Sequence, residues 1–554
     1  METRSDKFLV IGLDGATFEW LHPLTQSNKL PFLKQLLAQS AWGQLESTVP
    51  PFTATAWSSF MTGANPGEHG ILAFEVRDRF NYDQLVAGFV NGDQHDLTIW
   101  EVLNANNKTV GVVNVPLTYP ARPVDGYMIT GMMSPKNGDR ITYPSELLNT
   151  LGDYKIDVEF IRDGDDFDRY VNLDKEKMLV EIHQVMQARL QKCWQLVQEK
   201  PTDFFMVVFT CTDRLSHFFW DELCDVIAGN LPTPLHTAVL DLLIELDSGI
   251  EKLIEFAGSE PSIMLMSDHG FGPSPTKRAH LNVWLEQNNW LAKRQRESWG
   301  DLEYWRVWIG QRTWLKQILR SLIPQKSQDS LTKSSMQNSR EIVDWTKTKA
   351  FLVPIYFQVC GISINSVGDR REGIVPAGDD YESVRIAIIE ELKQLTDPKT
   401  RRPIVERVSR REDIFKGQHL QSMPDIIVEL DPDYVGAQSL AGSQIVEPHI
   451  PFRSGEHRSD GIFSLKSPTV PAQADVRGLK LQDVAATICY AMGLPQPTAF
   501  DATVQSQIFD QSFFESNPIQ FENIRSNYEP FRSDADLSEE ELVEQRLRGL
   551  GYLE

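Results

Sequence analysis

The sequence predicts an α/β fold in which a largely parallel central sheet is enclosed by helices and carries insertions. Four unbroken apolar runs have the length of strands that are buried on both faces of a parallel sheet, at residues 7–16, 109–116, 203–213 and 261–270. Between these runs, residues 176–199 and 235–257 carry apolar side chains at helical spacing. The 554 residues suffice for one large α/β domain with insertions, or for two to three ordinary domains.

The composition is that of a globular protein, with 41% hydrophobic and 24% charged residues. The formal net charge of -23 argues against a nucleic acid duplex as the main partner, because a phosphate backbone binds a basic surface. It is compatible with a small phosphorylated substrate, since bound metal ions can supply local positive charge.

The five cysteines include no CxxC pair, so we expect neither a disulfide framework nor a thiolate zinc site. This cysteine usage is typical of a reducing cytoplasm. The N-terminal apolar run predicts a strand and not a signal peptide, and no segment reaches the ~18 continuous apolar residues of a membrane span.

Three of the four predicted strands end at an acidic residue, Asp14, Asp213 or Asp268. Ligands in open α/β sheets bind outside the carboxyl ends of the strands, so these residues are expected to converge on one edge of the sheet. Each aspartate alone could be a turn former or a helix N-cap. Three of them at strand ends, two with a histidine nearby, favour a metal site.

Three histidines supply further candidate ligands. Asp213 and His217 are four residues apart, which places both on one face of a helix. Asp268 and His269 are adjacent and therefore point in different directions, as residues that bind two different ions would. His457 precedes an apolar, strand-like run. A mixed set of carboxylates and imidazoles suits zinc or manganese better than calcium.

The stretch PPFTATAWSSFMTGANPGEHG, at residues 50–70, carries five hydroxyl side chains between two groups of proline and glycine. It could be an ordinary helix entry, or one of its hydroxyls could be a nucleophile. A hydroxyl that follows Pro50 and Pro51 would lie at a helix N-terminus, where free amide groups favour an anion. No GxSxG motif is present that would single out a serine.

Five segments, in this order and spacing, resemble the alkaline phosphatase superfamily: GLDGATF, TATAWSSFMTGANPGEHGI, TDRLSHFFW, MSDHGFG and GEHRSDGIF. The chain is most similar to the type I phosphodiesterase/nucleotide pyrophosphatase branch, and within it to predicted phosphohydrolases and phosphomutases. The resemblance implies an alkaline phosphatase-like α/β/α sandwich. The catalytic core would be discontinuous, at residues 1–290 and 341–510.

The resemblance also implies a role for each matched residue. Asp213, His217 and His457 would bind one divalent ion, and Asp14, Asp268 and His269 would bind the other. Alignment to the threonine-glycine pair at residues 62–63 selects Thr53 as the metal-bound nucleophile, with Thr55 as the alternative. Zinc is the expected metal, and manganese is the alternative.

The expected function is therefore that of a two-metal phosphohydrolase that cleaves a phosphodiester or a phosphomonoester through a phospho-threonine. A phosphomutase or head-group transferase would use the same site and pass the phosphoryl group to an alcohol. A non-catalytic, metal-stabilised binding protein is the third hypothesis.

Two segments have no support from these motifs. Residues 291–340 form a basic, tryptophan-rich stretch in an acidic protein. The pattern favours a helical insertion or lid, and a contact with a membrane surface or another anionic partner is the alternative. Residues 511–554 form the C-terminal tail, in which Ser538 and Glu541 predict a capped helix.

Overall fold

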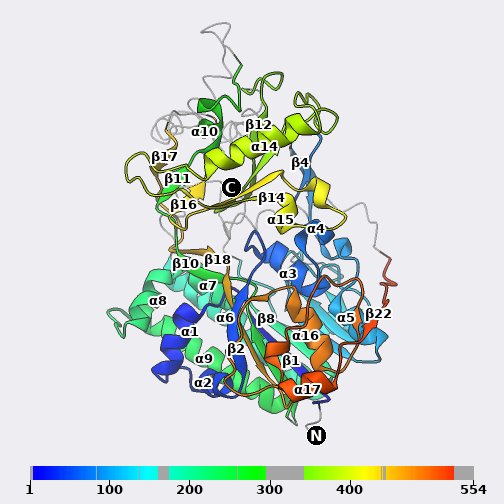
Figure 1. The fold of residues 1–554 in the computed structure, drawn as a ribbon. Helices are drawn as coiled ribbons and strands as arrows, with labels where there is room; N and C mark the ends of the chain where they lie inside the picture. The colour runs from blue at the N-terminus through cyan, green and yellow to red at the C-terminus, as the bar shows by residue number, and fades with distance from the viewer. Residues whose placement is uncertain are drawn as a thin grey trace.

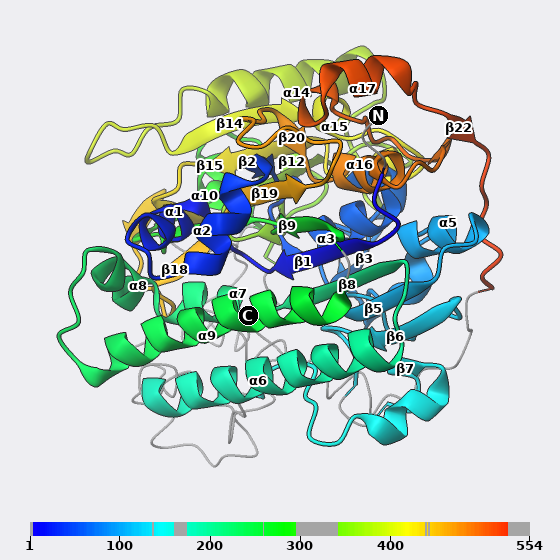
Figure 2. The same ribbon diagram turned by 90° about the horizontal axis from the view of Figure 1, so that it is seen from below.

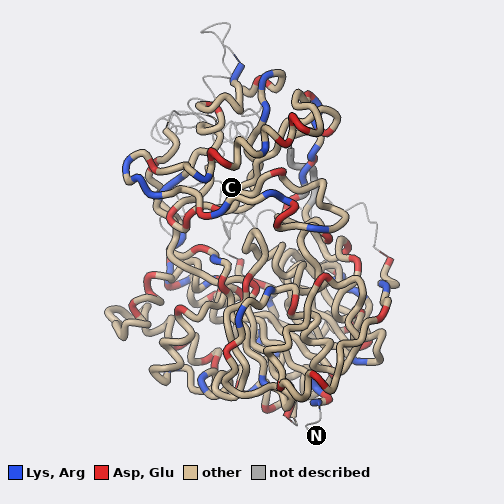
Figure 3. The backbone as a smooth tube through the Cα atoms, viewed as in Figure 1, with Lys and Arg blue, Asp and Glu red and all other residues tan. Residues whose placement is uncertain are grey.

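The computed structural model describes residues 4–82, 84–135, 138–159, 174–258, 260–294, 342–437, 440 and 444–529. Figure 1 shows a larger lobe built around a nine-stranded sheet and a smaller lobe with a sheet of its own. Acidic positions are distributed over both lobes (Figure 3), in keeping with the net charge of -23. None of the described helices is long and apolar enough to cross a lipid bilayer.

The four predicted strands form the centre of the larger sheet. They are adjacent and parallel, in the order β9 (Ser262–Met266), β1 (Phe8–Leu13), β8 (Phe204–Phe209) and β5 (Val110–Val115). Every residue of these strands is buried, as expected for unbroken apolar runs covered on both faces. The prediction of a largely parallel sheet is confirmed.

The sheet is completed at each edge by strands outside these four runs, and one of them, β19, is the apolar run that follows His457. On one side, β19 (Asp460–Lys466) runs antiparallel between β9 and β2 (Ala41–Glu46), and β20 (Leu479–Lys480) follows. On the other side lie β6 (Gly126–Thr130) and the antiparallel β7 (Thr142–Tyr143). Two strands therefore oppose the direction of the other seven.

Helices cover both faces of this sheet. One face packs against α1 (Phe18–Gln26), α2 (Pro31–Ala38), α6 (Lys175–Glu199) and α9 (Pro234–Ala257). The other face packs against α3 (Thr53–Thr62), α5 (Ile99–Ala105) and α16 (Asp483–Ala491). Figure 2 shows α6 and α9 on one side of the sheet and α16 on the other. The predicted helices at 176–199 and 235–257 correspond to α6 and α9.

The smaller lobe has an antiparallel sheet. Its strand order is β12 (Ala350–Tyr356), β13 (Val359–Ile364), β15 (Ile426–Leu430) and β14 (Val405–Arg410). A separate hydrophobic core joins this sheet to α10 (Leu281–Gln287) and α14 (Asp379–Leu392). A three-stranded sheet of β16 (Tyr434–Gly436), β11 (Lys277–Ala279) and β17 (Val446–Pro448) lies alongside.

Most of the smaller lobe is joined to the larger lobe through two strands that pair with each other, and the earlier segment around Tyr82 also packs in its core. The chain leaves the larger lobe after β10 (Gly270–Pro273) and returns at β18 (Gly455–Arg458), and these strands form an antiparallel ladder. Figure 1 shows β10, β18 and α3 where the two lobes meet. Both strands of this ladder adjoin predicted metal ligands.

Two predicted segments lie largely outside the described residues. Residues 295–341 make up nearly all of the basic, tryptophan-rich segment, and residues 530–554 contain the predicted C-terminal helix. The described part of the tail forms α17 (Gln511–Ser516) and the short strand β22 (Phe521–Glu522). All five cysteines are free, as their spacing predicts.

Candidate active site

The seven predicted site residues gather at the carboxyl ends of the central strands. Asp14 directly follows β1, and Asp268 and His269 connect β9 to β10. Asp213 and His217 lie on α7 (Cys211–Phe218), the helix that follows β8. Thr53, at the start of α3, and His457, on β18, complete the set, and all seven residues are buried.

Asp14, Asp268 and His269 form the first group of candidate ligands. Their ligand atoms lie within 4.8 Å of one another, and His269 Nε2 is 3.3 Å from Asp268 Oδ2 and 3.7 Å from Asp14 Oδ1. Trp57 Nε1–H donates a hydrogen bond to Asp14 Oδ2 at 3.2 Å, and the Gly15 amide donates to Asp268 Oδ1 at 3.2 Å. The buried Asp14 Oδ1 and Asp268 Oδ2 atoms accept no hydrogen bond within the described part of the chain. Each carboxylate is thus anchored by one oxygen, while its other oxygen is available to a cation.

Asp213, His217 and His457 form the second group. Asp213 Oδ1 lies 3.5 Å from His217 Nε2 and 3.4 Å from His457 Nε2, and the two Nε2 atoms are 2.9 Å apart. The predicted helical spacing of Asp213 and His217 therefore brings both side chains to one point. The rings of His457 and His269 are stacked with centroids 3.6 Å apart, so the two groups adjoin.

Backbone carbonyl groups fix the orientation of the three imidazoles. The Nδ1 atom of His217 lies 3.1 Å from Gly455 O, and that of His457 lies 3.0 Å from Pro51 O. His269 Nδ1 faces the carbonyl oxygen of the next residue at 3.2 Å. A carbonyl oxygen only accepts, so each Nδ1 carries the proton and each Nε2 presents its lone pair to the centre of the site.

Burial keeps these imidazoles neutral. It lowers the pKa of His269 to about 4 and lowers the pKa of His217 well below its usual value, with a further contribution from Arg453. Burial, together with the neighbouring His269, also lowers the pKa of His457. Neutral imidazole is the form that binds a metal ion.

The carboxylates of the site affect one another through their charges. Burial, reinforced by Asp268 and Asp213, raises the pKa of Asp14 well above its ordinary value. Burial also raises the pKa of Asp268 to about 7. Burial opposes the ionisation of Asp213 as well, but the charged guanidinium of Arg214, which contacts it, holds its pKa well below the usual range. A buried cluster of three carboxylates is stabilised by cations, so the donor set fits divalent metal ions.

Thr53 is the hydroxyl that reaches this cluster. It is the first residue of α3, it is 1% exposed, and its Oγ1 lies 3.4 Å from His269 Nε2. The first backbone hydrogen bond of the helix runs from the Ala56 amide to Phe52 O, so the amides of the preceding turn remain available to an anion.

None of the other four hydroxyls of this stretch bonds a predicted ligand among the described residues. Ser58 Oγ donates to Ala54 O at 2.7 Å, and Thr62 Oγ1 donates to Ser58 O at 2.7 Å. Ser59 Oγ bonds the buried His69 Nε2 at 2.9 Å. Thr55 Oγ1 is buried and makes no hydrogen bond with the described residues. Thr53 is therefore the one of the five hydroxyls that the structure joins to a predicted ligand.

Sequence reasoning missed several residues that hold the ligands in place. Arg214 contacts the Asp213 carboxylate, and its Nη2 lies 2.6 Å from Asp157 Oδ2, with both side chains at most 2% exposed. Arg214 directly follows Asp213 in the chain, which was an available signal. Asp157 gave no signal, because its contact with Arg214 depends on the tertiary fold.

A second missed group flanks His217. Arg453 Nη1 lies 3.2 Å from His217 Nε2, and Arg453 Nη2–H donates to Glu456 Oε2 at 2.9 Å. Tyr356, from β12 of the smaller lobe, donates its hydroxyl proton to Glu456 Oε1 at 2.6 Å. Glu456 adjoins His457 in the sequence and forms a third possible ligand group with His217 and His457.

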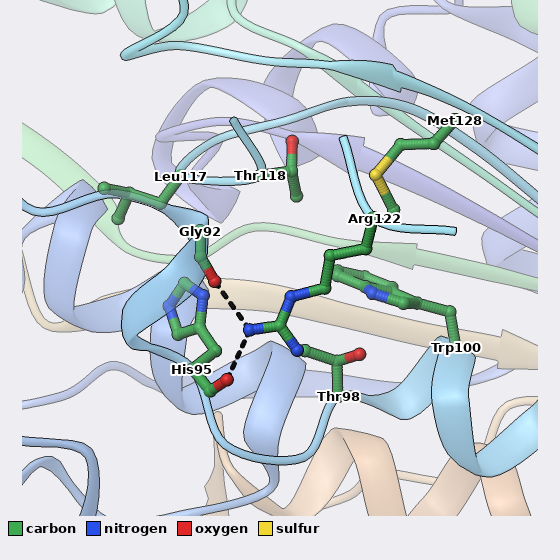
Figure 4. A pocket seen from close by; sticks show the side chains of 8 residues that line it. All are labelled: Gly92, His95, Thr98, Trp100, Leu117, Thr118, Arg122 and Met128. Carbon is green, nitrogen blue, oxygen red and sulfur yellow. Dashed lines mark hydrogen bonds between the residues drawn. The ribbon is translucent and has the colours of Figure 1, made fainter. Parts of the chain in front are cut away.

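A small cavity lies beside the helix that carries Thr53. Its volume is about 10 Å³, which is at most the space of one water molecule. Figure 4 shows Arg122 donating to the carbonyl oxygens of Gly92 and His95 in its wall. His95 Nε2 in turn lies 3.0 Å from Ser58 Oγ on α3. The cavity is too small for a substrate, and its lining supports α3.

Comparison with protein families gives a match over most of the chain. A family model described as type I phosphodiesterase/nucleotide pyrophosphatase matches residues 8–457, from the first residue of β1 to His457. All seven predicted site residues fall within this range. A search of curated proteins gave no match.

Solved structures with a similar fold include phosphonoacetate hydrolase from Sinorhizobium meliloti 1021. Its complex with phosphonoformate has 15% identity and a TM-score of 0.53, and its complex with phosphonoacetate has 14% and 0.52. Each alignment covers 88% of this chain and 94% of the hydrolase. Murine ectonucleotide pyrophosphatase/phosphodiesterase 5 in complex with AMP has 12% identity and a TM-score of 0.49, with coverage of 91% and 98%. The alkaline phosphatase-like fold expected from the sequence is confirmed.

Proposed function

This chain belongs to the type I phosphodiesterase/nucleotide pyrophosphatase family, and on that premise we propose that it is a two-metal phosphohydrolase with a threonine nucleophile. The family consists of metal-dependent phosphoric ester hydrolases, so ester hydrolysis is the general activity. The finer proposal is that Thr53 attacks a phosphodiester or phosphomonoester and becomes phosphorylated. The distance of 3.4 Å between Thr53 Oγ1 and His269 Nε2 carries this proposal.

The two ligand groups described above would hold the ions. Asp14, Asp268 and His269 would bind one, with Thr53 Oγ1 beside it, and Asp213, His217 and His457 would bind the other. Bound divalent ions supply positive charge that lowers the pKa of a hydroxyl and offsets the charge of phosphoryl oxygens. Zinc is the metal that this set of carboxylates and imidazoles suits best, with manganese as the alternative.

The residues of the chain orient the reaction. Thr53 lies at the N-terminus of α3, where free backbone amides can donate to a phosphoryl oxygen. The Thr53 hydroxyl gives its proton to water and its oxygen attacks phosphorus. The bond from phosphorus to the leaving oxygen breaks, and the electron pair goes to that oxygen. Water then cleaves the phospho-threonine, which restores the hydroxyl of Thr53 and releases phosphate or a phosphomonoester.

The test is an assay of the purified chain with bis-p-nitrophenyl phosphate and p-nitrophenyl phosphate, with zinc or manganese added. Thr53→Ala should abolish turnover, while Thr53→Ser should retain part of it because serine keeps the hydroxyl. Thr55→Ala is the matched control, since it removes a neighbouring buried hydroxyl from the same helix. Full turnover by Thr53→Ala, or inactivity of the native chain with every metal, would refute the mechanism.

The covalent intermediate gives a second measurement. Acid quenching during turnover should trap a phosphoryl group on the peptide that contains Thr53, which mass spectrometry can locate. An enzyme that activates water directly would leave this peptide unmodified. Added alcohol acceptors would reveal a transferase, because the phosphoryl group would then appear in an alkyl phosphate.

A further inference from the structure

Arg453 and Thr53 contact different ligand groups of the candidate site. Thr53 Oγ1 is 3.4 Å from His269 Nε2 in the first ligand group, whereas Arg453 Nη1 is 3.2 Å from His217 Nε2 in the second. His457 joins the two groups, because its ring stacks on His269 and its Nε2 is 2.9 Å from that of His217. The guanidinium group therefore adjoins the ligand group that the nucleophile does not contact.

Several contacts fix the direction in which Arg453 Nη1 points. Arg453 Nη2–H donates to Glu456 Oε2 at 2.9 Å, and Tyr356 holds the other oxygen of the same carboxylate at 2.6 Å. The guanidinium carbon also lies 5.2 Å from the centre of the Phe357 ring and 5.0 Å from that of Phe452. The side chain of Arg453 is 1% exposed. These contacts keep the charged guanidinium group beside the ligand cluster, where it can stabilise developing negative charge.

An in-line phosphoryl transfer places the attacking and leaving oxygens on opposite sides of phosphorus. With Thr53 as the attacking group, the leaving oxygen would lie toward the His217 end of the site. Arg453 Nη1–H points to the His217 Nε2 lone pair, and a metal ion on His217 would use that same lone pair. The N–H group would then face whichever oxygen binds beside His217.

We infer that Arg453 is a further catalytic residue, which donates a hydrogen bond to the leaving-group oxygen. This role rests on the proposed function. As the bond from phosphorus to that oxygen breaks, its electron pair becomes negative charge on the oxygen, and the guanidinium stabilises this charge without giving up a proton. Arginine remains protonated throughout, so the leaving group departs as an alkoxide or phenoxide that later takes a proton from water.

The role predicts a specific dependence on the leaving group. In the transition state, the leaving oxygen of a phenyl ester carries more negative charge than that of a p-nitrophenyl ester, because the nitro group draws charge into the ring. Removal of Arg453 should therefore lower kcat/KM most for esters with poor leaving groups. The measurement is kcat/KM for a series of aryl phosphate esters, from p-nitrophenyl to phenyl, with the zinc-loaded full chain.

In Arg453→Gln, kcat/KM for the phenyl ester should fall by about 10²-fold, as for the loss of one oxyanion donor. The loss for the p-nitrophenyl ester should be much smaller, so the leaving-group dependence becomes steeper. Arg453→Lys keeps the charge, so the dependence of its log(kcat/KM) on the pKa of the leaving group should have a slope between those of the native chain and Arg453→Gln. The bound metal content should equal that of the native chain in both variants, and a loss of metal in either would assign Arg453 to ligand positioning instead.

The double variant Arg453→Gln/Glu456→Gln excludes a purely structural role. It removes both charges of the buried pair, so it leaves no unpaired carboxylate that would hinder folding. We expect the steep leaving-group dependence to persist in it. Recovery of the native slope would overturn the inference, because Arg453 would then serve only to neutralise Glu456.

A matched control separates the loss of a group at the active site from the general effect of breaking a buried ion pair. Arg411→Gln breaks another buried pair, with Asp425 at 2.8 Å in the smaller lobe, and should leave the slope unchanged. An equal loss on every ester in Arg453→Gln would also overturn the inference. Activity that survives Thr53→Ala would instead refute the proposed function, so the two failures are distinguishable.

Discussion

His217 and His457 direct their Nε2 atoms at each other across 2.9 Å, although a backbone carbonyl holds the proton of each ring on the opposite nitrogen. Two neutral imidazoles in these tautomers cannot form a hydrogen bond with each other, since both facing atoms are acceptors. A cation that binds both lone pairs turns this repulsive pair into a favourable one. Asp213 Oδ1, within 3.5 Å of both nitrogens, adds a negative charge at the same point.

Metal removal should therefore destabilise the fold as well as abolish activity. A ligand present at 100 times its dissociation constant stabilises the native state by about 2.7 kcal/mol. Thermal unfolding of the chain should shift to lower temperature after chelation and return when zinc is added back. Identical unfolding temperatures with and without metal would show that these side chains bind no ion in the native state.

Asp268→Asn should reduce the amount of metal bound per chain, because an amide cannot replace the charge of a carboxylate ligand. The metal-free variant should be at least as stable as the metal-free native chain, since the substitution removes repulsion between Asp268 and Asp14. Elemental analysis and thermal unfolding measure the two effects. Asp247→Asn is the control, because Asp247 is equally buried but binds the amides of Phe32 and Leu33. Unchanged metal content in Asp268→Asn would remove this residue from the ligand set.

Asp157→Asn should weaken metal binding without touching a ligand. Asp157 holds Arg214 at 2.6 Å, and Arg214 in turn contacts the Asp213 carboxylate. Loss of a residue that orients a metal ligand typically costs 10- to 100-fold in metal affinity, so we expect about that decrease here. Competition with a chelator of known affinity measures it. Arg214→Lys should be milder than Arg214→Met, and equal effects of these two variants would contradict the role of the charge.

His95 should make the protein less stable in acid. Burial, with a contribution from Arg122, lowers its pKa from 6.5 to about 3. The unfolded chain thus binds a proton at His95 below about pH 6.5 that the folded chain does not take up until about pH 3. The neutral imidazole contributes stability that is present above pH 6.5 and is lost as the pH falls, by about 1.4 kcal/mol per pH unit.

Denaturant unfolding of the native chain and of His95→Asn between pH 7 and pH 4 tests this linkage. Asparagine can keep a hydrogen bond to Ser58 but does not titrate. The difference in unfolding free energy between the two chains should therefore shrink as the pH falls. Parallel pH profiles would show that His95 is not the group responsible.

The central sheet and the convergence of the candidate ligands could be predicted because both follow largely from local patterns. Unbroken apolar runs identified β1, β5, β8 and β9, and parallel strands bring their carboxyl ends to one edge. The spacing of Asp213 and His217 was sufficient because α7 is regular. Selection of Thr53 needed the family resemblance, since five hydroxyls share one short stretch.

The remaining features depend on contacts between distant parts of the chain. Tyr356 and Glu456 are 100 residues apart, and Arg214 and Asp157 are 57 apart, so no local pattern joins them. β19 enters the sheet antiparallel between β9 and β2, a position that its own sequence does not encode. The residues that orient the ligands were therefore harder to find than the ligands themselves.

The ladder between β10 and β18 joins the two lobes and fixes the position of a predicted ligand. It pairs Phe271 with His457, and most of the smaller lobe lies between these two strands in the sequence, although Tyr82 also packs in its core. A shift of one residue in this ladder would turn His457 to the opposite face, so the register must be kept. Two residues of the chain between the strands carry a second constraint, because Tyr356 bonds Glu456 and Arg453 contacts His217. The smaller lobe is therefore tied to the catalytic frame at these points as well as through the ladder.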